Sequence, residues 1–218
     1  MKAAGRRSGS ADVGEIRLGV RLPPVGEPIG GLLSCWRRSH PEISLTIYEM
    51  SDQELAAALE GRRLDVALVP SFTLWPHAAA LPVYREHLVA ALPADHPLVA
   101  CDALSWKRIV NEIFLVQGWN ESQVAREFYA SLVGSGARFQ VHAASKQSVL
   151  ALVAAGFGIT LAVKSQSDVC IPRVVFRHID EPNAWLRVDL VWLPEIEDPA
   201  IGRFVTFMRD EARSRRLL

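Results

Sequence analysis

Residues 43–69 read ISLTIYEMSDQELAAALEGRRLDVALV, and this stretch decides the fold class. Its first part alternates apolar and polar residues, which predicts a strand with one buried face. Ser51 and Glu54 then have the spacing of a capping box, which predicts the first turn of a helix. The apolar run 64–69 predicts a second strand, covered on both faces as in parallel sheets. A strand, a helix and a strand in this order predict an α/β unit.

The alternation of strands and helices continues on both sides of this stretch. We expect further strands at 16–20, 86–92, 113–116, 139–142, 159–163, 173–179 and 185–193. We expect further helices over 27–39, 102–109 and 122–134, one that begins at Ser145, and one around 201–208. The pairing between these strands is expected to be mainly parallel.

The pattern runs twice, over about 14–91 and again over about 112–165, which predicts two similar α/β lobes joined by crossing strands. We place the first lobe at 14–91 and 176–218 and the second at 92–175. Residues 1–13, MKAAGRRSGSADV, are polar and rich in Gly, Ser and Arg, so we interpret them as a linker or disordered arm. A cleft between two such lobes is where a ligand is expected, at the carboxyl ends of the strands.

Composition narrows the classes of function. Of the 218 residues, 50% are hydrophobic, and 24 basic side chains balance 24 acidic ones. A protein that grips DNA with its whole surface would carry a basic excess, so any role with nucleic acid is indirect or lies outside this stretch. We find neither an apolar run long enough for a membrane helix nor a secretory signal. The three cysteines are far apart, which favours reduced thiols and a cytoplasmic location.

Motifs for bond-making chemistry are poorly supported. Gly156-Phe157-Gly158 follows a helix and precedes a strand, the reverse of a dinucleotide-binding order, so we interpret it as the end of a helix. His77, His87 and His96 lack the spacing of metal ligands. The sequence contains no Gly-x-Ser-x-Gly motif. We therefore expect no enzyme, no metal and no cofactor.

What remains is a set of polar loops at the carboxyl ends of the expected strands. In a two-lobe fold they converge on the cleft, and together they predict a small-molecule site. The candidates are Arg21, Ser51, Asp52, Pro70, Gln117, Gly118, Trp119, Asn120, Ser145 and Gln147.

Four of these candidates leave alternatives open. Ser51 and Ser145 are helix caps on one interpretation and ligand contacts on the other. Asp52 would repel a carboxylate ligand if it faced the cleft, unless Arg21 offset its charge. Trp119 either packs on its own lobe or stacks on an aromatic ligand.

At this point the sequence resembles a known family. The residues that carry the resemblance are 14–20 (GEIRLGV), 40–43 (HPEI), Leu55, Leu59 and Gly61, 64–67 (LDVA), 96–98 (HPL) and 152–159 (LVAAGFGI). Their order and spacing are similar to those of the effector-binding domain of LysR-type transcriptional regulators. The resemblance covers about residues 14 to 210.

The resemblance implies a fold like that of type 2 periplasmic binding proteins, with two Rossmann-like lobes and a ligand cleft between them. It implies a small effector, often an organic or aromatic acid. The effector contacts carry over onto Leu22, Pro23 and Pro24, the cap at Ser51 and Asp52, the loop 117–120, and the region of Ser145 and Gln147.

The resemblance also implies an assembly. Lobe one of one subunit would pair with lobe two of another in homodimers, and full regulators would form homotetramers. Contact with DNA would come only through the family's N-terminal winged helix-turn-helix, which we expect to be absent from this chain. The alternative is a free-standing solute-binding protein of the same fold, which would need an export signal.

Overall fold

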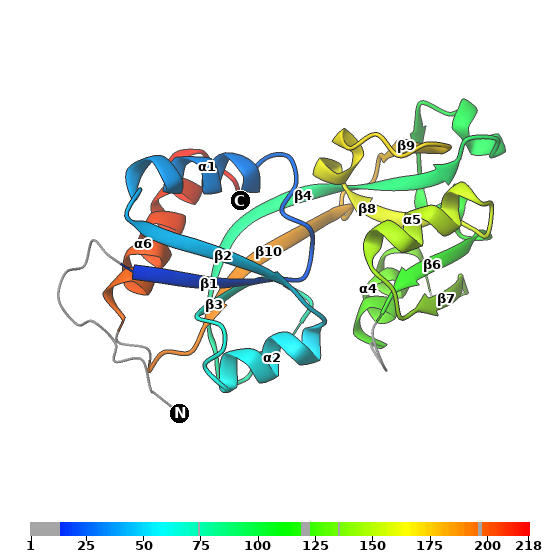
Figure 1. The fold of residues 1–218 in the computed structure, drawn as a ribbon. Helices are drawn as coiled ribbons and strands as arrows, with labels where there is room; N and C mark the ends of the chain where they lie inside the picture. Colours follow the sequence, from blue (N-terminus) through cyan, green and yellow to red (C-terminus); the bar gives the residue numbers. More distant parts are fainter. Residues whose placement is uncertain (1–13, 74, 119–122, 135, 196–197) are drawn as a thin grey trace.

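The computed structural model describes residues 14–73, 75–118, 123–134, 136–195 and 198–218. Figure 1 shows two lobes side by side, joined by two long strands that run through both. These strands are β4 (Ala79–Pro93) and β10 (Trp185–Trp192), which pair antiparallel from Ala79 to His87. The expected two-lobe α/β architecture is confirmed.

Lobe I is a mixed sheet with helices on both faces. Its strand order is β2-β1-β3-β10-β4, in which β1 runs parallel to β2 and β3 while β10 runs antiparallel to β3 and β4. The strands not yet given are β1 (Gly14–Val20), β2 (Ile43–Glu49) and β3 (Val66–Pro70). The helices are α1 (Ile29–Ser39), α2 (Asp52–Glu60) and α6 (Pro199–Ser214).

The helices of lobe I cover its sheet with stripes of apolar residues. α1 buries Ile29, Leu32 and Trp36, spaced three and four apart as one helical face requires. Phe204 of α6 meets the Trp36 ring edge-on at a centroid distance of 5.0 Å. α2 packs on the opposite face through a separate cluster around Leu55. Burying both faces explains why the strand residues of β3 are all apolar and buried.

Lobe II is built around the far half of β4. That half pairs antiparallel with β8 (Thr160–Val163) and β9 (Val174–Ile179), and β9 pairs parallel with the short β5 (Ala103–Leu104). A second, two-stranded sheet joins β6 (Ile113–Gln117) and β7 (Arg138–His142) in parallel. The helices are α3 (Trp106–Ile109), α4 (Gln123–Val133) and α5 (Lys146–Ala154), with 3-10 turns η1 (Pro97–Ala100) and η2 (Lys164–Asp168).

Each lobe has a hydrophobic core of its own. The core of lobe I includes Val188 and Leu190 of β10, whereas the core of lobe II includes Leu88 of β4 and Leu186 of β10. The chain therefore passes from one core to the other within these two strands. The expected boundaries 91/92 and 175/176 fall within the second core rather than between the two.

Two local expectations were wrong. The pairing is mixed rather than mainly parallel, because β4 and β10 cross between the lobes in opposite directions and impose antiparallel ladders on β3, β8 and β9. The expected helix over 102–109 is the strand β5 followed by the four-residue α3. Glu181 accepts a hydrogen bond from the backbone N–H of Trp106 at 3.0 Å, so a distant side chain fixes where this helix begins.

The glycine pair after α5 ends that helix, as the sequence predicted. Gly156 has a φ of +83°, a left-handed conformation that favours glycine, and its N–H donates to the carbonyl of Val153 at 2.9 Å. Gly158 lies against β6, where an added Cβ would clash with the carbonyl oxygen of Ile113. The next residue, Ile159, donates to that same carbonyl at 2.9 Å. This close approach joins the β6–β7 pair to the strand β8.

Candidate ligand-binding site

A cavity of about 60 Å³ lies between the two lobes. Lobe I contributes the segment after β1, the end of β3 and the segment after it. Lobe II contributes β6, α4, the start of α5, β8 and η2, and the connecting strands β4 and β10 contribute one residue each. Its lining residues are Arg21, Leu22, Pro70, Phe72, Leu88, Gln117, Ala125, Phe128, Tyr129, Lys146, Leu161, Ala162, Val163, Gln166 and Leu186. The wall is mostly apolar, with a few polar groups that converge on it, which is the usual composition of a ligand site.

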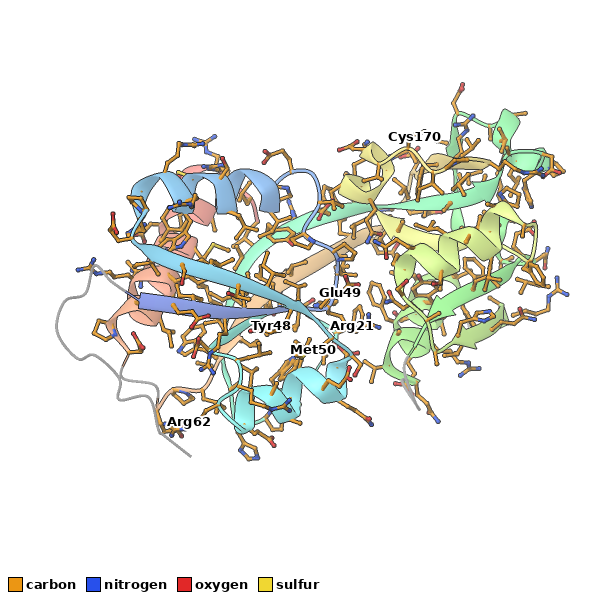
Figure 2. All side chains as sticks on the ribbon, in the orientation of Figure 1. Arg21, Tyr48, Glu49, Met50, Arg62 and Cys170 are labelled. Carbon is orange, nitrogen blue, oxygen red and sulfur yellow. The ribbon has the colours of Figure 1, made fainter. Side chains whose placement is uncertain are left out.

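Arg21 forms the charged part of the lobe I wall. It follows β1 directly, and its backbone N–H donates to the carbonyl of Leu68 at 3.2 Å. Its Nε donates to Asp52 Oδ2 at 3.3 Å, and with the Gln117 amide turned to present its oxygen, Nη1 lies 2.9 Å from that oxygen. Figure 2 shows Arg21 on the side of lobe I that faces lobe II. The guanidinium therefore bridges the lobes, since Asp52 belongs to lobe I and Gln117 to lobe II.

Lys146 forms the charged part of the lobe II wall. It is the first residue of α5 and shares the buried face of that helix with Val149, Leu150 and Val153. Its Nζ donates to the carbonyl oxygen of Leu161 at 2.5 Å and to Thr160 Oγ1 at 3.2 Å. Both acceptors are neutral, and none of the ion pairs in the described part of the chain involves Lys146.

The surroundings of Lys146 oppose its positive charge. Burial, and then the charge of Arg21, lower the pKa of Lys146 to about 7. The amine also extends from the first turn of α5, where the free backbone N–H groups favour anions over cations. A negative group placed beside this amine would relieve all three effects. The cavity is therefore electrostatically suited to an anion.

Tyr129 of α4 completes the polar cluster around Lys146. Its hydroxyl donates to the carbonyl of Leu161 at 2.9 Å, the same oxygen that accepts from the lysine. Burial raises the pKa of Tyr129 to about 12, so the hydroxyl stays protonated near neutral pH. Thr160 donates its own hydroxyl hydrogen to Leu115 at 2.6 Å, which leaves its oxygen free to accept from Lys146.

Aromatic and aliphatic side chains close the cavity across the lobes. Phe72, in the segment after β3, stacks on Phe128 of α4 with ring centroids 4.5 Å apart and planes 24° apart. Leu22 packs against the cores of both lobes. These apolar contacts connect the two lobes at the cavity.

One buried polar atom of a lining residue, Nε2 of Gln166 in η2, has no hydrogen-bond partner in the described residues. Oδ1 of Asp52, which does not line the cavity, is also without a partner there. An unpaired buried donor such as Gln166 Nε2 costs free energy, which a ligand oxygen would recover. Together with Lys146 and Arg21, this donor adds to a site built to receive oxygen acceptors.

The structure brings some of the predicted site residues together. Arg21, Leu22, Pro70 and Gln117 line the cavity, and Asp52 touches it through Arg21. The pairing at 3.3 Å shows that Arg21 does offset the charge of Asp52.

Other predicted residues lie beside the cavity without lining it. The Ser51 oxygen accepts from Glu54 N at 3.3 Å and its hydrogen goes to the Glu54 carboxylate, while Ser145 Oγ accepts from Ser148 N at 3.2 Å. Gly118 donates its N–H to His142 at 2.9 Å. Pro23 and Pro24 are half-buried in the loop after β1, and Gln147 is exposed. Trp119 and Asn120 lie outside the described residues.

Sequence reasoning missed the residues that dominate the site, namely Lys146, Tyr129 and Gln166. It considered Ser145 and Gln147, which flank the lysine. The signal for Lys146 was present, because position 146 falls three residues before Val149 and four before Leu150 on the apolar face. A lysine on a buried stripe is rare, and this rarity marks it as a functional candidate.

Comparisons with known proteins agree with the fold. A family model described as the LysR substrate binding domain matches residues 9–213. The HTH-type transcriptional regulator YnfL of Escherichia coli K12, itself described as uncharacterized, is 26% identical over 208 residues, or 92% of this chain and 69% of that protein. The regulator CbbR of Rhizobium meliloti is 26% identical over 214 residues, or 94% and 65%.

Solved structures show the same arrangement. The reduced OxyR regulatory domain from Pseudomonas aeruginosa is 18% identical with a TM-score of 0.75, covering 94% of this chain and all of that one. The BenM effector-binding domain, solved with its effector benzoate, is 21% identical with a TM-score of 0.72, covering 94% and 95%. Likeness at these identities establishes the shared fold.

Proposed function

This chain belongs to the family of LysR substrate-binding domains, and we propose that its inter-lobe cavity binds a short-chain organic acid as effector. The observation that carries the proposal is Lys146, a buried amine with neutral hydrogen-bond partners and no acidic one among the described residues. A carboxylate beside Nζ supplies the missing countercharge. The unpaired Nε2 of Gln166 offers a second donor to the same carboxylate.

The size of the cavity sets the size of the acid. An engineered cavity of roughly 150 Å³ binds benzene, and this cavity is smaller, at about 60 Å³. An acid of about two to four carbons fits that space, with its alkyl part against Leu161, Val163 and Leu186. An aromatic acid would enter only if Phe72 and Phe128 separated.

The effector would act by favouring one arrangement of the lobes. It would contact Lys146 on lobe II and approach Arg21, which already links lobe I to Gln117. A ligand that binds the closed arrangement better shifts the population toward it, and a coupling of about 1–3 kcal/mol is enough for a useful switch. The lobes would turn about β4 and β10, the strands that connect them.

We further propose that this domain works within a cytoplasmic transcriptional regulator and reaches DNA through a separate winged helix-turn-helix. The curated relatives are transcriptional regulators, and this chain spans 69% and 65% of two of them. No described helix has the length and apolar character needed to cross a bilayer.

Pairing between subunits completes the proposal. Two edge strands expose large apolar residues: Ile47 and Tyr48 on β2 of lobe I, and Val141 on β7 of lobe II. Val124 on α4 is exposed close by in the same lobe. In a homodimer, lobe I of one subunit would cover lobe II of the other, and two dimers would form the tetramer. Ile47→Glu should then shift the purified chain toward monomer in sedimentation equilibrium, whereas an unchanged dimer would exclude β2.

The effector proposal is tested by calorimetric titration at pH 6.5 with three ligands of one size. Propionate should bind, while propanol and propylamine should bind at least tenfold more weakly. Of the three, only propionate carries a negative charge that attracts the protonated amine of Lys146. Propionate that binds no better than propanol would refute an anion site.

A further inference from the structure

The hydrogen bonds of Lys146 leave its nitrogen lone pair unused in the neutral form. A neutral amine has two N–H groups and one lone pair. Among the described residues, Lys146 Nζ donates to two acceptors, Thr160 Oγ1 at 3.2 Å and the Leu161 carbonyl at 2.5 Å. They take both hydrogens, so the lone pair is the position that remains. An amine with a free lone pair in the wall of a cavity is a nucleophile.

The environment populates that neutral form at ordinary pH. Because burial and Arg21 lower the pKa of Lys146 to about 7, roughly half of the molecules carry the free amine near neutrality. Exposed lysines, with an ordinary pKa of about 10.4, are almost entirely protonated there. Desolvation next to another cation is a recognised way to activate a lysine toward carbonyl groups.

The rest of the cavity suits a ligand that carries a carboxylate as well as a carbonyl. Gln166 Nε2 is an unpaired donor, and Arg21 supplies a positive charge on the opposite wall. We infer that Lys146 captures a small 2-oxo acid as a reversible imine in the inter-lobe cavity. The inference rests on the proposed function, since it assigns a chemical class of effector to that same site.

The reaction needs only the two partners. The amine nitrogen attacks the carbonyl carbon, a C–N bond forms, and the carbonyl oxygen takes up a proton to give a carbinolamine. The carbinolamine then loses water and the C=N bond remains. The oxygen of that water comes from the carbonyl group, and its two hydrogens correspond to the two that the amine has lost. Nothing is oxidised or reduced, and hydrolysis by water reverses the step. The apolar wall limits water and so favours the imine.

Reductive trapping tests the inference. The full chain is incubated with pyruvate and cyanoborohydride, digested, and analysed by mass spectrometry. We expect one adduct, with the mass of pyruvate less its carbonyl oxygen, on the peptide that contains Lys146. The sequence has only four lysines, at positions 2, 107, 146 and 164, so the site is assigned directly. Trapping should increase as the pH rises through about 7.

The variants Lys146→Arg and Lys107→Arg separate the possible outcomes. Lys146→Arg keeps a positive charge but lacks a primary amine, so it should lose the adduct, whereas Lys107→Arg, at an exposed position, should keep it. An adduct that persists in Lys146→Arg, or that spreads evenly over all the lysines, would overturn the inference. If propionate binds the wild type while pyruvate leaves no adduct, the imine fails and the anion site stands. If propionate fails as well, the proposed function fails with it.

Discussion

The helices α2 and α5 begin with similar serine caps and differ in the charge of the residue that follows the cap. Each is capped by a serine with nearly identical backbone angles, −68° and 162° for Ser51 and −66° and 162° for Ser145. The next residue is Asp52 in one helix and Lys146 in the other. The negative charge of Asp52 suits the positive end of its helix and pairs with Arg21. The positive charge of Lys146 is unfavourable at the same end of α5, and none of the described acidic side chains pairs with it. Function is expected where the local rule is broken.

Removing the amine of Lys146 should have the largest effect on the affinity for propionate. Lys146→Met keeps the length of the side chain and should weaken propionate binding by roughly 10- to 100-fold, because hydrogen bonds to charged groups contribute about 1.5–3 kcal/mol. The melting temperature should stay level or rise, since an apolar side chain replaces a buried amine. Calorimetry and thermal unfolding measure the two effects.

Lys107→Met is the matched control for that substitution. Lys107 is exposed on α3, and its loss should change neither quantity. If the Lys146→Met protein binds propionate with wild-type affinity, Lys146 does not contact the ligand.

Raising the pH should weaken the binding of simple anions. Since the pKa of Lys146 is lowered to about 7, affinity for propionate should fall by up to about tenfold per pH unit above that value. Titrations at pH 6.5, 7.5 and 8.5 measure the slope. A flat profile would show that the lysine does not titrate in this range.

The free energy of unfolding should rise with pH, in contrast to the affinity for propionate, which should fall. In the unfolded chain Lys146 regains its ordinary pKa of 10.5, so above pH 7 the unfolded state binds a proton that the native state lacks. This contribution makes the free energy of unfolding rise with pH between about 7 and 10.5. The gap in melting temperature between Lys146→Met and the wild type should therefore narrow from pH 7 to pH 9, whereas a constant gap would contradict the linkage.

Removing the negative charge of Asp52 on α2 should raise the affinity for propionate, by a smaller factor than the loss of Lys146 lowers it. Asp52→Asn keeps the shape of the side chain and leaves Arg21 without its countercharge, so propionate should bind roughly threefold to tenfold more tightly. Titration at pH 6.5 checks this. Weaker binding would mean that Asp52 positions Arg21 rather than competing with the ligand.

The caps should affect stability and leave affinity nearly unchanged. Ser51→Ala removes a hydrogen bond to the charged carboxylate of Glu54 and one from Glu54 N, whereas Ser145→Ala removes two bonds to Ser148 in which no charged group takes part. Each substitution should lower the free energy of unfolding by about 1–2 kcal/mol, and Ser51→Ala should cost more because its lost acceptor is charged. Chemical denaturation compares the two. A marked loss of propionate affinity in either variant would show that its hydroxyl contacts the ligand.

The regular elements could be predicted because their apolar residues repeat with a helical or strand period. The first half of β4 could not, because Pro82 argues against a strand. At that position β4 has a strand partner on one side only, β10, because its pairing with β8 and β9 begins at Leu88 and Val89. The ladder with β10 also shifts register between Pro82 and Tyr84, and proline is tolerated at such open and irregular positions. An open side of this kind depends on which strands meet, and sequence spacing does not encode it.

Part of the cavity wall could be predicted from the sequence. Rules about strand ends singled out Arg21, Pro70 and Gln117, and the family resemblance added Leu22; all four line the cavity. The stack of Phe72 on Phe128 and the contact of Tyr129 with Leu161 depend on how the two lobes meet across the cleft. Residues that come together from separate lobes leave no pattern along the chain.

A crystal structure of the complex with propionate would show where the effector binds. We expect one propionate between the lobes, with a carboxylate oxygen within hydrogen-bond distance of Lys146 Nζ and its alkyl chain against Leu161 and Val163. Propionate bound elsewhere, or a cavity that stays empty in crystals soaked to saturation, would contradict this expectation.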